Sequence, residues 1–136
     1  MYPHELMIGN WLMHYNGTTM QVTRIEGCHF ACGSPHCWEY NNVFKPIPIT
    51  VEILEKNGWT QCNVDDDGSV QYEYEEGNVD VDWWSPSINI PGLFGCSTRD
   101  GNTGIIHEMI NELPISYVHE LQNILRMCGI KKEIVL

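Results

Sequence analysis

The sequence predicts an α+β fold, with an antiparallel sheet or small barrel that a short central helix and a C-terminal helix cover. Three features carry this prediction: apolar and polar residues alternate around glycine-containing turns, a capped helical pattern spans residues 51–56, and apolar residues recur at helical spacing over residues 116–128. With 136 residues and 43% hydrophobic content, the chain can bury a substantial core. We therefore expect a single domain, residues 1–136.

The first strands are predicted around Asn16-Gly17, in the segment WLMHYNGTTMQV. A type I′ turn requires positive φ at both central residues, and Asn-Gly is its preferred pair. A two-residue loop would place Trp11 opposite Val22 and Met13 opposite Met20. This register gives a hairpin with Trp11 on its core face.

The central helix is predicted from Val51 to Lys56 in the segment KPIPITVEILEKNGW. Thr50 is a preferred N-cap residue, and Glu52 lies in the positively polarised first turn. Gly58 suits a left-handed residue just after the helix. The two preceding prolines favour an extended approach to the helix.

An acidic hairpin is predicted over residues 70–83, with Glu76-Gly77 as its turn. Tyr72, Val81 and Trp83 would lie on its apolar face. We expect the C-terminal helix to pack on the sheet face that carries these three residues and Trp11. The reverse face would carry four carboxylates: Glu73, Glu75, Asp80 and Asp82. In this register Glu73 faces Asp80 directly.

Opposed like charges destabilise a sheet, so the carboxylate face requires an explanation. A solvated surface that tolerates the repulsion is one explanation, and a docking surface for a basic protein partner is the other. The formal charge of −11, from seven Lys and Arg against eighteen Asp and Glu, opposes direct nucleic-acid binding. We therefore expect no direct contact with DNA or RNA.

The C-terminal helix is predicted over residues 116–128, with His119 and Gln122 on its polar face. Its His119-Glu120-x-x-Asn123 pattern resembles a helical zinc-peptidase motif, but Asn stands where the second His is required. The same pattern begins at His107, which we expect on a strand after a turn at Asp100-Gly101. Neither copy predicts a peptidase, and an enzyme is the less favoured class.

Cysteine and histidine residues cluster in the segment CHFACGSPHC. A zinc site there would use Cys28, Cys32, His36 and Cys37. Thiolate and imidazole are preferred zinc ligands, but the spacing differs from the usual C-x2-C knuckle, so a loop with small buried thiols is the alternative. We otherwise expect no cofactor.

Neither a secretory signal nor an apolar run of membrane-spanning length is evident in the sequence. We therefore expect a cytoplasmic protein that does not enter a membrane. The reducing cytosol would keep its six cysteines as thiols.

Three segments carry a family resemblance: ELMIGNWLMHYNG, KPIPIT with the helix after it, and ISYVHELQN near the C-terminus. Together they resemble a family of small proteins of unassigned activity carried by phages and mobile elements of anaerobic gut bacteria. The family pattern has ELRIGN, PIPLT and YVHQLQ, so Glu120 replaces a common Gln. The resemblance does not cover the cysteine and acidic segments, and it implies no particular activity.

The favoured function is binding: an accessory protein of a mobile element that inhibits a basic host factor through its acidic face. The alternative is a protein that binds or sequesters a small, nucleotide-like signal. That alternative would use aromatic and cationic side chains, namely Trp38, Trp83, Trp84 and Arg99.

Overall fold

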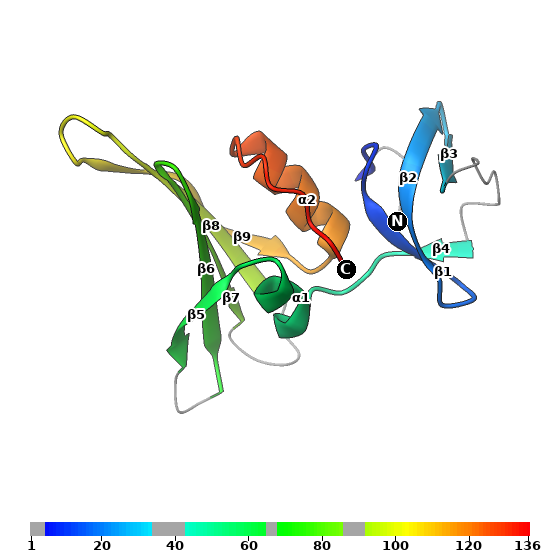
Figure 1. Ribbon diagram of the computed structural model, residues 1–136, viewed down its shortest axis with the longest axis horizontal. Coiled ribbons are helices and arrows are strands. Elements are labelled where there is room, and N and C mark those ends of the chain that lie inside the picture. The colour runs from blue at the N-terminus through cyan, green and yellow to red at the C-terminus, as the bar shows by residue number, and fades with distance from the viewer. Residues whose placement is uncertain (1–4, 34–42, 65–67, 86–91) are drawn as a thin grey trace. The chain divides into compact units, whose positions relative to one another are not determined.

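The computed structural model describes residues 5–33, 43–64, 68–85 and 92–136, and the chain divides into two compact units (Figure 1). Unit 1 contains Met1–Pro48 and Tyr117–Ile124, and unit 2 contains Ile49–Ser116 and Leu125–Leu136. Each unit has its own antiparallel sheet, and the described chain has two helices, which confirms the α+β class.

The sheet of unit 1 has the strand order β3-β2-β1-β4. Its strands are β1 (Trp11–His14), β2 (Thr19–Glu26), β3 (His29–Cys32) and β4 (Phe44–Lys45). Buried apolar side chains from these strands and the preceding segment form one cluster: Leu6, Leu12, Val22, Phe30, Cys32 and Phe44. Unit 1 therefore has a core of its own.

The register predicted for the β1–β2 hairpin is wrong by one residue. Leu12 pairs with Met20 and Met13 pairs with Thr19, so the loop contains three residues, Tyr15 to Gly17. Gly17 has φ +93, whereas Asn16 has no positive φ. The turn is therefore not type I′, and Leu12 faces the core in place of Trp11.

Helix α2 (Val118–Met127) contributes its first residues to unit 1 through a polar network. The Gln122 side chain accepts from the Trp11 amide at 2.8 Å and donates to the Gly9 carbonyl at 3.0 Å. Asn10 Nδ2 donates to Asn123 Oδ1 at 2.8 Å, and Asn123 Nδ2 donates to the Glu5 carbonyl at 2.9 Å. These bonds join the Glu5–Trp11 segment to one helix.

His119 and Gln122 are buried, 2% and 4% exposed, so their predicted position on a solvent-facing polar side of the helix is wrong. Their neighbours explain the error. Gln122 meets backbone groups at the start of β1, and the His119 ring stacks on the Tyr117 ring with centroids 6.0 Å apart. Helical periodicity identifies apolar stripes, but it cannot show that a polar side chain has a buried partner.

The segments that carry the family resemblance contact one another in unit 1. Beside the Asn10–Asn123 bond, the Val118 amide donates to the Ile47 carbonyl at 2.8 Å, and Pro48 forms a β-bridge with Tyr117. These contacts lie in unit 1, whereas the helix after KPIPIT lies in unit 2. The resembling segments do not include the acidic strands of unit 2.

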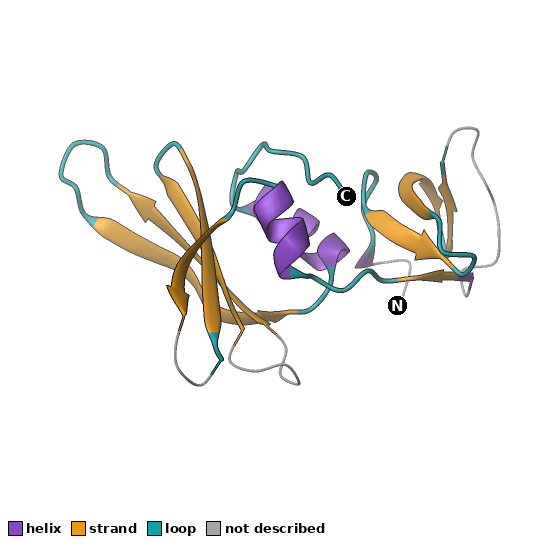
Figure 2. Ribbon diagram, turned by 60° about the horizontal axis from the view of Figure 1, so that its bottom comes forward, coloured by secondary structure: helices purple, strands orange, loops and turns teal. Residues whose placement is uncertain are grey.

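The sheet of unit 2 has the order β5-β6-β7-β8-β9, in which every strand pairs with its neighbour in sequence. Figure 2 shows the strands in orange and the helices in purple. The strands are β5 (Thr60–Val64), β6 (Val70–Glu76), β7 (Val79–Ser85), β8 (Gly92–Arg99) and β9 (Ile106–Ile115). As predicted, strands pair on either side of Asp100-Gly101, and His107 lies on a strand.

One face of this sheet is apolar and covered. Tyr72, Val81, Trp83 and Phe94 are buried on it. Gly92 permits the packing of Trp83, because a Cβ at position 92 would lie 2.0 Å from the indole ring. Tyr72, Val81 and Trp83 thus occupy the predicted apolar face, but Trp11 belongs to the other sheet.

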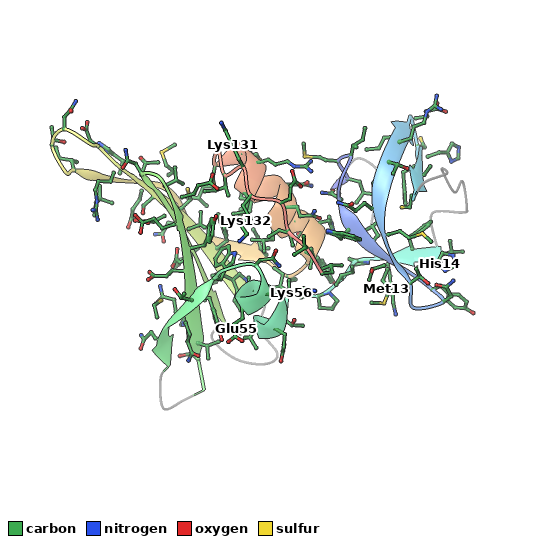
Figure 3. All side chains as sticks on the ribbon, in the orientation of Figure 1. Met13, His14, Glu55, Lys56, Lys131 and Lys132 are labelled. Atoms are coloured by element: carbon green, nitrogen blue, oxygen red, sulfur yellow. The ribbon has the colours of Figure 1, made fainter. Side chains whose placement is uncertain are left out.

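Helix α1 (Val51–Lys56) has the predicted bounds, and its Thr50 cap accepts a hydrogen bond from the Ile53 amide. Gly58 follows with φ +84. The Tyr72 hydroxyl donates to Glu55 Oε1 at 2.8 Å, which places α1 over β6. The C-terminal segment lies on the same face, with Lys132 Nζ 5.4 Å from the centre of the Tyr74 ring (Figure 3).

The register predicted for the β6–β7 hairpin is wrong by two residues. Glu76 pairs with Val79, so the loop is Gly77-Asn78, and Glu73 pairs with Asp82 in place of Asp80. Gly77 has φ +61, which fits the first central position of a type II′ turn. Because side chains alternate with period two, this shift leaves every residue on its predicted face.

Candidate functional site

The uncovered face of the five-stranded sheet in unit 2 carries rows of carboxylates. Cross-strand pairing forms one row, in strand order, from Glu75, Asp80, Ser97 and Glu108. A second row contains Thr60, Glu73, Asp82 and Gly95. The four predicted partner-binding residues, Glu73, Glu75, Asp80 and Asp82, therefore lie together on one surface.

Asp82 is partly buried on this surface. Gln71 Nε2 donates to Asp82 Oδ2 at 3.1 Å, and Asp82 Oδ1 lies above Gly95, where a Cβ would approach to 2.5 Å. Burial raises the pKa of Asp82 above its ordinary value, while the Gln71 hydrogen bond acts in the opposite direction. Gly95 thus makes room for a partly desolvated acid in the middle of the sheet.

A β-bulge brings a further carboxylate to this face. Phe94 pairs with Leu113 and Cys96 with Ile110, so Asn111 and Glu112 on β9 oppose the single residue Gly95 on β8. Glu112 has φ +54, and among the described residues it is the only non-glycine with positive φ. Such a backbone conformation is unfavourable for a residue with a Cβ, and bulges commonly redirect side chains.

Two shallow hollows lie along the carboxylate rows. One, of about 280 Å³, is lined by residues that include Asp82, Trp84, Glu108 and Glu112. The other, of about 460 Å³, is lined by residues that include Glu73, Glu75, Asp80 and Asp82. Asp82, Gln71 and Ser97 line both hollows, so the two form one continuous surface.

None of the residues that line either hollow is Lys or Arg. The field of these carboxylates also reaches a neighbouring thiol: after burial, Glu73 is the next cause that raises the pKa of Cys62. A surface with this charge attracts cations and repels phosphate. We call this surface the acidic face, defined by Glu73, Glu75, Asp80, Asp82, Glu108 and Glu112.

The acidic face spreads its charges instead of focusing them on one ion. Among the residues that the structure describes, no three or more His, Cys, Asp or Glu side chains are grouped as metal ligands.

The zinc prediction falls partly outside the described residues. Cys28 is exposed on the β2–β3 loop and Cys32 is buried in the core of unit 1. His36 and Cys37 lie outside the described residues, so zinc at this segment stays a prediction.

The residues predicted for the alternative ligand site have different environments. Trp83 is 7% exposed, and its Nε1 donates to the Ile115 carbonyl at 3.3 Å within the core. Trp84, the next residue on β7, lines the smaller hollow. Arg99 is exposed at the end of β8, and Trp38 lies outside the described residues.

His119 begins the His-Glu-x-x-Asn pattern of α2, which does not predict a peptidase. Its Nε2 lies 3.9 Å from Glu5 Oε2, and its Nδ1 has no hydrogen-bond partner among the described residues. Burial is the main cause that lowers the pKa of His119. The ring is therefore a neutral, buried part of unit 1.

Sequence reasoning missed Glu108 and Glu112 as members of this surface. The two glutamates depend on the β8–β9 register, which shifts twice between Phe94 and Ser97. The alternation in IHEMINELPI does not reveal those shifts.

Comparisons with protein-family models, with curated proteins and with solved structures found no match. Within the described part of the chain, neither helix has the length and apolar character needed to cross a membrane.

Proposed function

We propose that this chain is a non-enzymatic binding protein that docks a basic protein partner on its acidic face. The observation that carries the proposal is the arrangement of six carboxylates around two joined hollows that no Lys or Arg lines. Complementary charge of this kind accelerates encounter and selects partners.

Fold stability gives no reason for this arrangement. Glu73 pairs with Asp82, and Glu75 pairs with Asp80. Each opposed like-charge pair destabilises a sheet by roughly 0.2 to 1 kcal/mol. A function in binding explains why acids stand where neutral polar residues would favour folding.

The family resemblance supplies a setting for the proposal. If a mobile element carries this protein, the partner is a basic protein of the bacterial host, and a carboxylate surface can imitate the charge of a phosphate backbone. The protein would then occupy a surface that its target uses for nucleic acid.

A phosphate-bearing small ligand is less well supported as the target. Trp84 lines the smaller hollow, but the residues around it are acidic or neutral. Without a cation in the lining, phosphate would meet repulsion. A thermal-shift screen of nucleotides tests this alternative, because a ligand that binds the folded protein raises its melting temperature.

The test of the proposal is capture of basic proteins from host lysate by wild type and by the double variant Glu73→Lys/Glu75→Lys. Both glutamates are exposed, so the fold should tolerate the change. The matched control is Glu26→Lys/Glu133→Lys, which changes the net charge equally at exposed positions outside the acidic face.

We expect the first variant to lose capture and the control to retain it. Capture by wild type should weaken between low and physiological salt, because exposed charges are screened. Equal capture by both variants, or capture unaffected by salt, would contradict the proposal.

A further inference from the structure

Strand β9 forms one edge of the five-stranded sheet and, within the described chain, pairs only with β8. It is long, from Ile106 to Ile115, and nearly all of its residues are exposed. One side of its backbone therefore offers amide and carbonyl groups that no neighbouring strand uses. Open edges of this kind are the sites where another chain can add a strand.

Large apolar side chains are exposed along the same edge. Their exposed fractions are 55% for Ile105, 57% for Ile106, 65% for Met109 and 40% for Leu113. A surface that is simply solvated and acidic does not explain why apolar side chains are exposed beside the carboxylates. Exposed apolar side chains on an open edge are characteristic of a surface that a partner covers.

A second copy of this chain is a poor occupant of the edge at neutral pH. Two copies of β9 paired antiparallel bring Glu108 and Glu112 of one copy close to those of the other, and each copy carries a formal charge of −11. This repulsion disfavours pairing between two copies of β9. A strand with positive charge would instead be attracted to the edge.

The pairing rows define where that charge would lie. Glu75, Asp80, Ser97 and Glu108 follow one another across the sheet, so a residue of an added strand opposite Glu108 would continue this row. Its neighbours along the added strand would point to the other face, because side chains alternate. A segment with alternating basic and apolar residues therefore matches both properties of the edge.

We propose that the β9 edge accepts an extended segment of the basic partner by strand addition, with its basic side chains over the acidic face. The addition is confined to Ile106–Glu108, where β9 keeps a single register, because the shifts at Met109 and at Asn111 and Glu112 interrupt the edge beyond that point. This inference rests on the proposed function and specifies the form in which the partner binds.

The experiment uses a short synthetic peptide of alternating lysine and valine, and the same peptide N-methylated at every residue. N-methylation keeps the charge but removes the backbone donors that strand addition needs. Each peptide is titrated at low salt into wild-type protein to measure its affinity. Hydrogen–deuterium exchange then reports which backbone amides the bound peptide protects. The Glu73→Lys/Glu75→Lys variant is titrated in parallel.

We expect the unmodified peptide to bind at least about tenfold more tightly than the methylated one and to slow exchange over residues 106–108. Equal affinities, no binding of either peptide, or unchanged exchange in this segment would overturn strand addition. If the charge reversal weakens the binding of both peptides equally, the result supports docking on the acidic face and contradicts strand addition. If binding and the protection of β9 survive the charge reversal, the result supports strand addition at β9 and contradicts docking on the acidic face.

Discussion

His119 keeps an imidazole inside unit 1, with one nitrogen 3.9 Å from the Glu5 carboxylate and the other without a hydrogen-bond partner among the described residues. The negative charges of Glu5 and Glu120 stabilise a protonated ring and so raise its pKa. Burial has the larger effect and lowers the pKa of His119 below 6.5. The folded chain therefore favours the neutral ring. In the unfolded chain the same ring takes up a proton at its ordinary pKa.

This difference predicts acid sensitivity. Stability from neutral His119 is present above the unfolded pKa of 6.5 and is lost as pH falls through 6.5 toward the lower folded value. The melting temperature of wild type should therefore drop between pH 7 and pH 5 by more than that of His119→Gln. His107→Gln, at an exposed position, should follow wild type. Parallel pH profiles for wild type and His119→Gln would refute this assignment.

Glu73 provides a second residue-scale prediction, because its cross-strand neighbour is Asp82. Glu73→Lys exchanges a repulsive pair for an attractive one, which should stabilise the fold by about 0.2 to 1 kcal/mol. Thermal unfolding should show a melting temperature higher by about 1 to 5 °C. Glu73→Gln, which only removes the charge, should fall between the two, and a variant no more stable than wild type would argue against the observed pairing.

At the scale of elements, the first turns of α2 are bound to unit 1 by Gln122. Gln122→Ala removes the acceptor of the Trp11 amide and the donor to the Gly9 carbonyl. The Gly9 carbonyl keeps the Gln21 side-chain amide as a donor. The variant therefore loses two hydrogen bonds of about 0.5 to 1.5 kcal/mol each, and we expect it to be about 1 to 3 kcal/mol less stable in denaturant unfolding. Met127→Ala, 79% exposed on the same helix, should change stability by less than about 0.5 kcal/mol.

Local signals predicted α1 in full, because Thr50, Glu52 and Gly58 mark a helix within one short segment. The same kind of local signal did not predict the correct register of either hairpin. Asn16-Gly17 fits a two-residue loop, but a three-residue loop also ends in a left-handed glycine, and the structure has the latter. Gly77 could likewise end one turn type or begin another. Glycine marks the turn, but it does not fix how many residues the turn contains.

At the scale of the whole molecule, alternation predicted strands and faces but not their grouping into two sheets. Trp11 and Trp83 both lie in alternating segments, and nothing local indicates that β1 pairs with β4 while β7 pairs with β8. The acidic face was predictable on β6 and β7, since its acids alternate with Tyr72, Tyr74 and Val81. Its extension to Glu108 and Glu112 was not, because two bulges separate them from any simple register.

Net charge and the open β9 edge together predict how the molecule self-associates. A charge of −11 at pH 7 should keep copies apart, whereas near the pI of about 4.7 the repulsion disappears and the exposed apolar edge remains. Light scattering should therefore show a monomer at pH 7 and association as pH approaches 5.

Met109→Lys should delay this association, because lysine on an open edge discourages strand pairing between copies. The matched control is Met127→Lys, which makes the same change at an exposed position on α2, away from the β9 edge. If β9 is the associating edge, Met109→Lys should stay monomeric at a pH where wild type and Met127→Lys associate. Equal protection by the two lysines would show that added charge acts generally and that β9 has no special part in self-association.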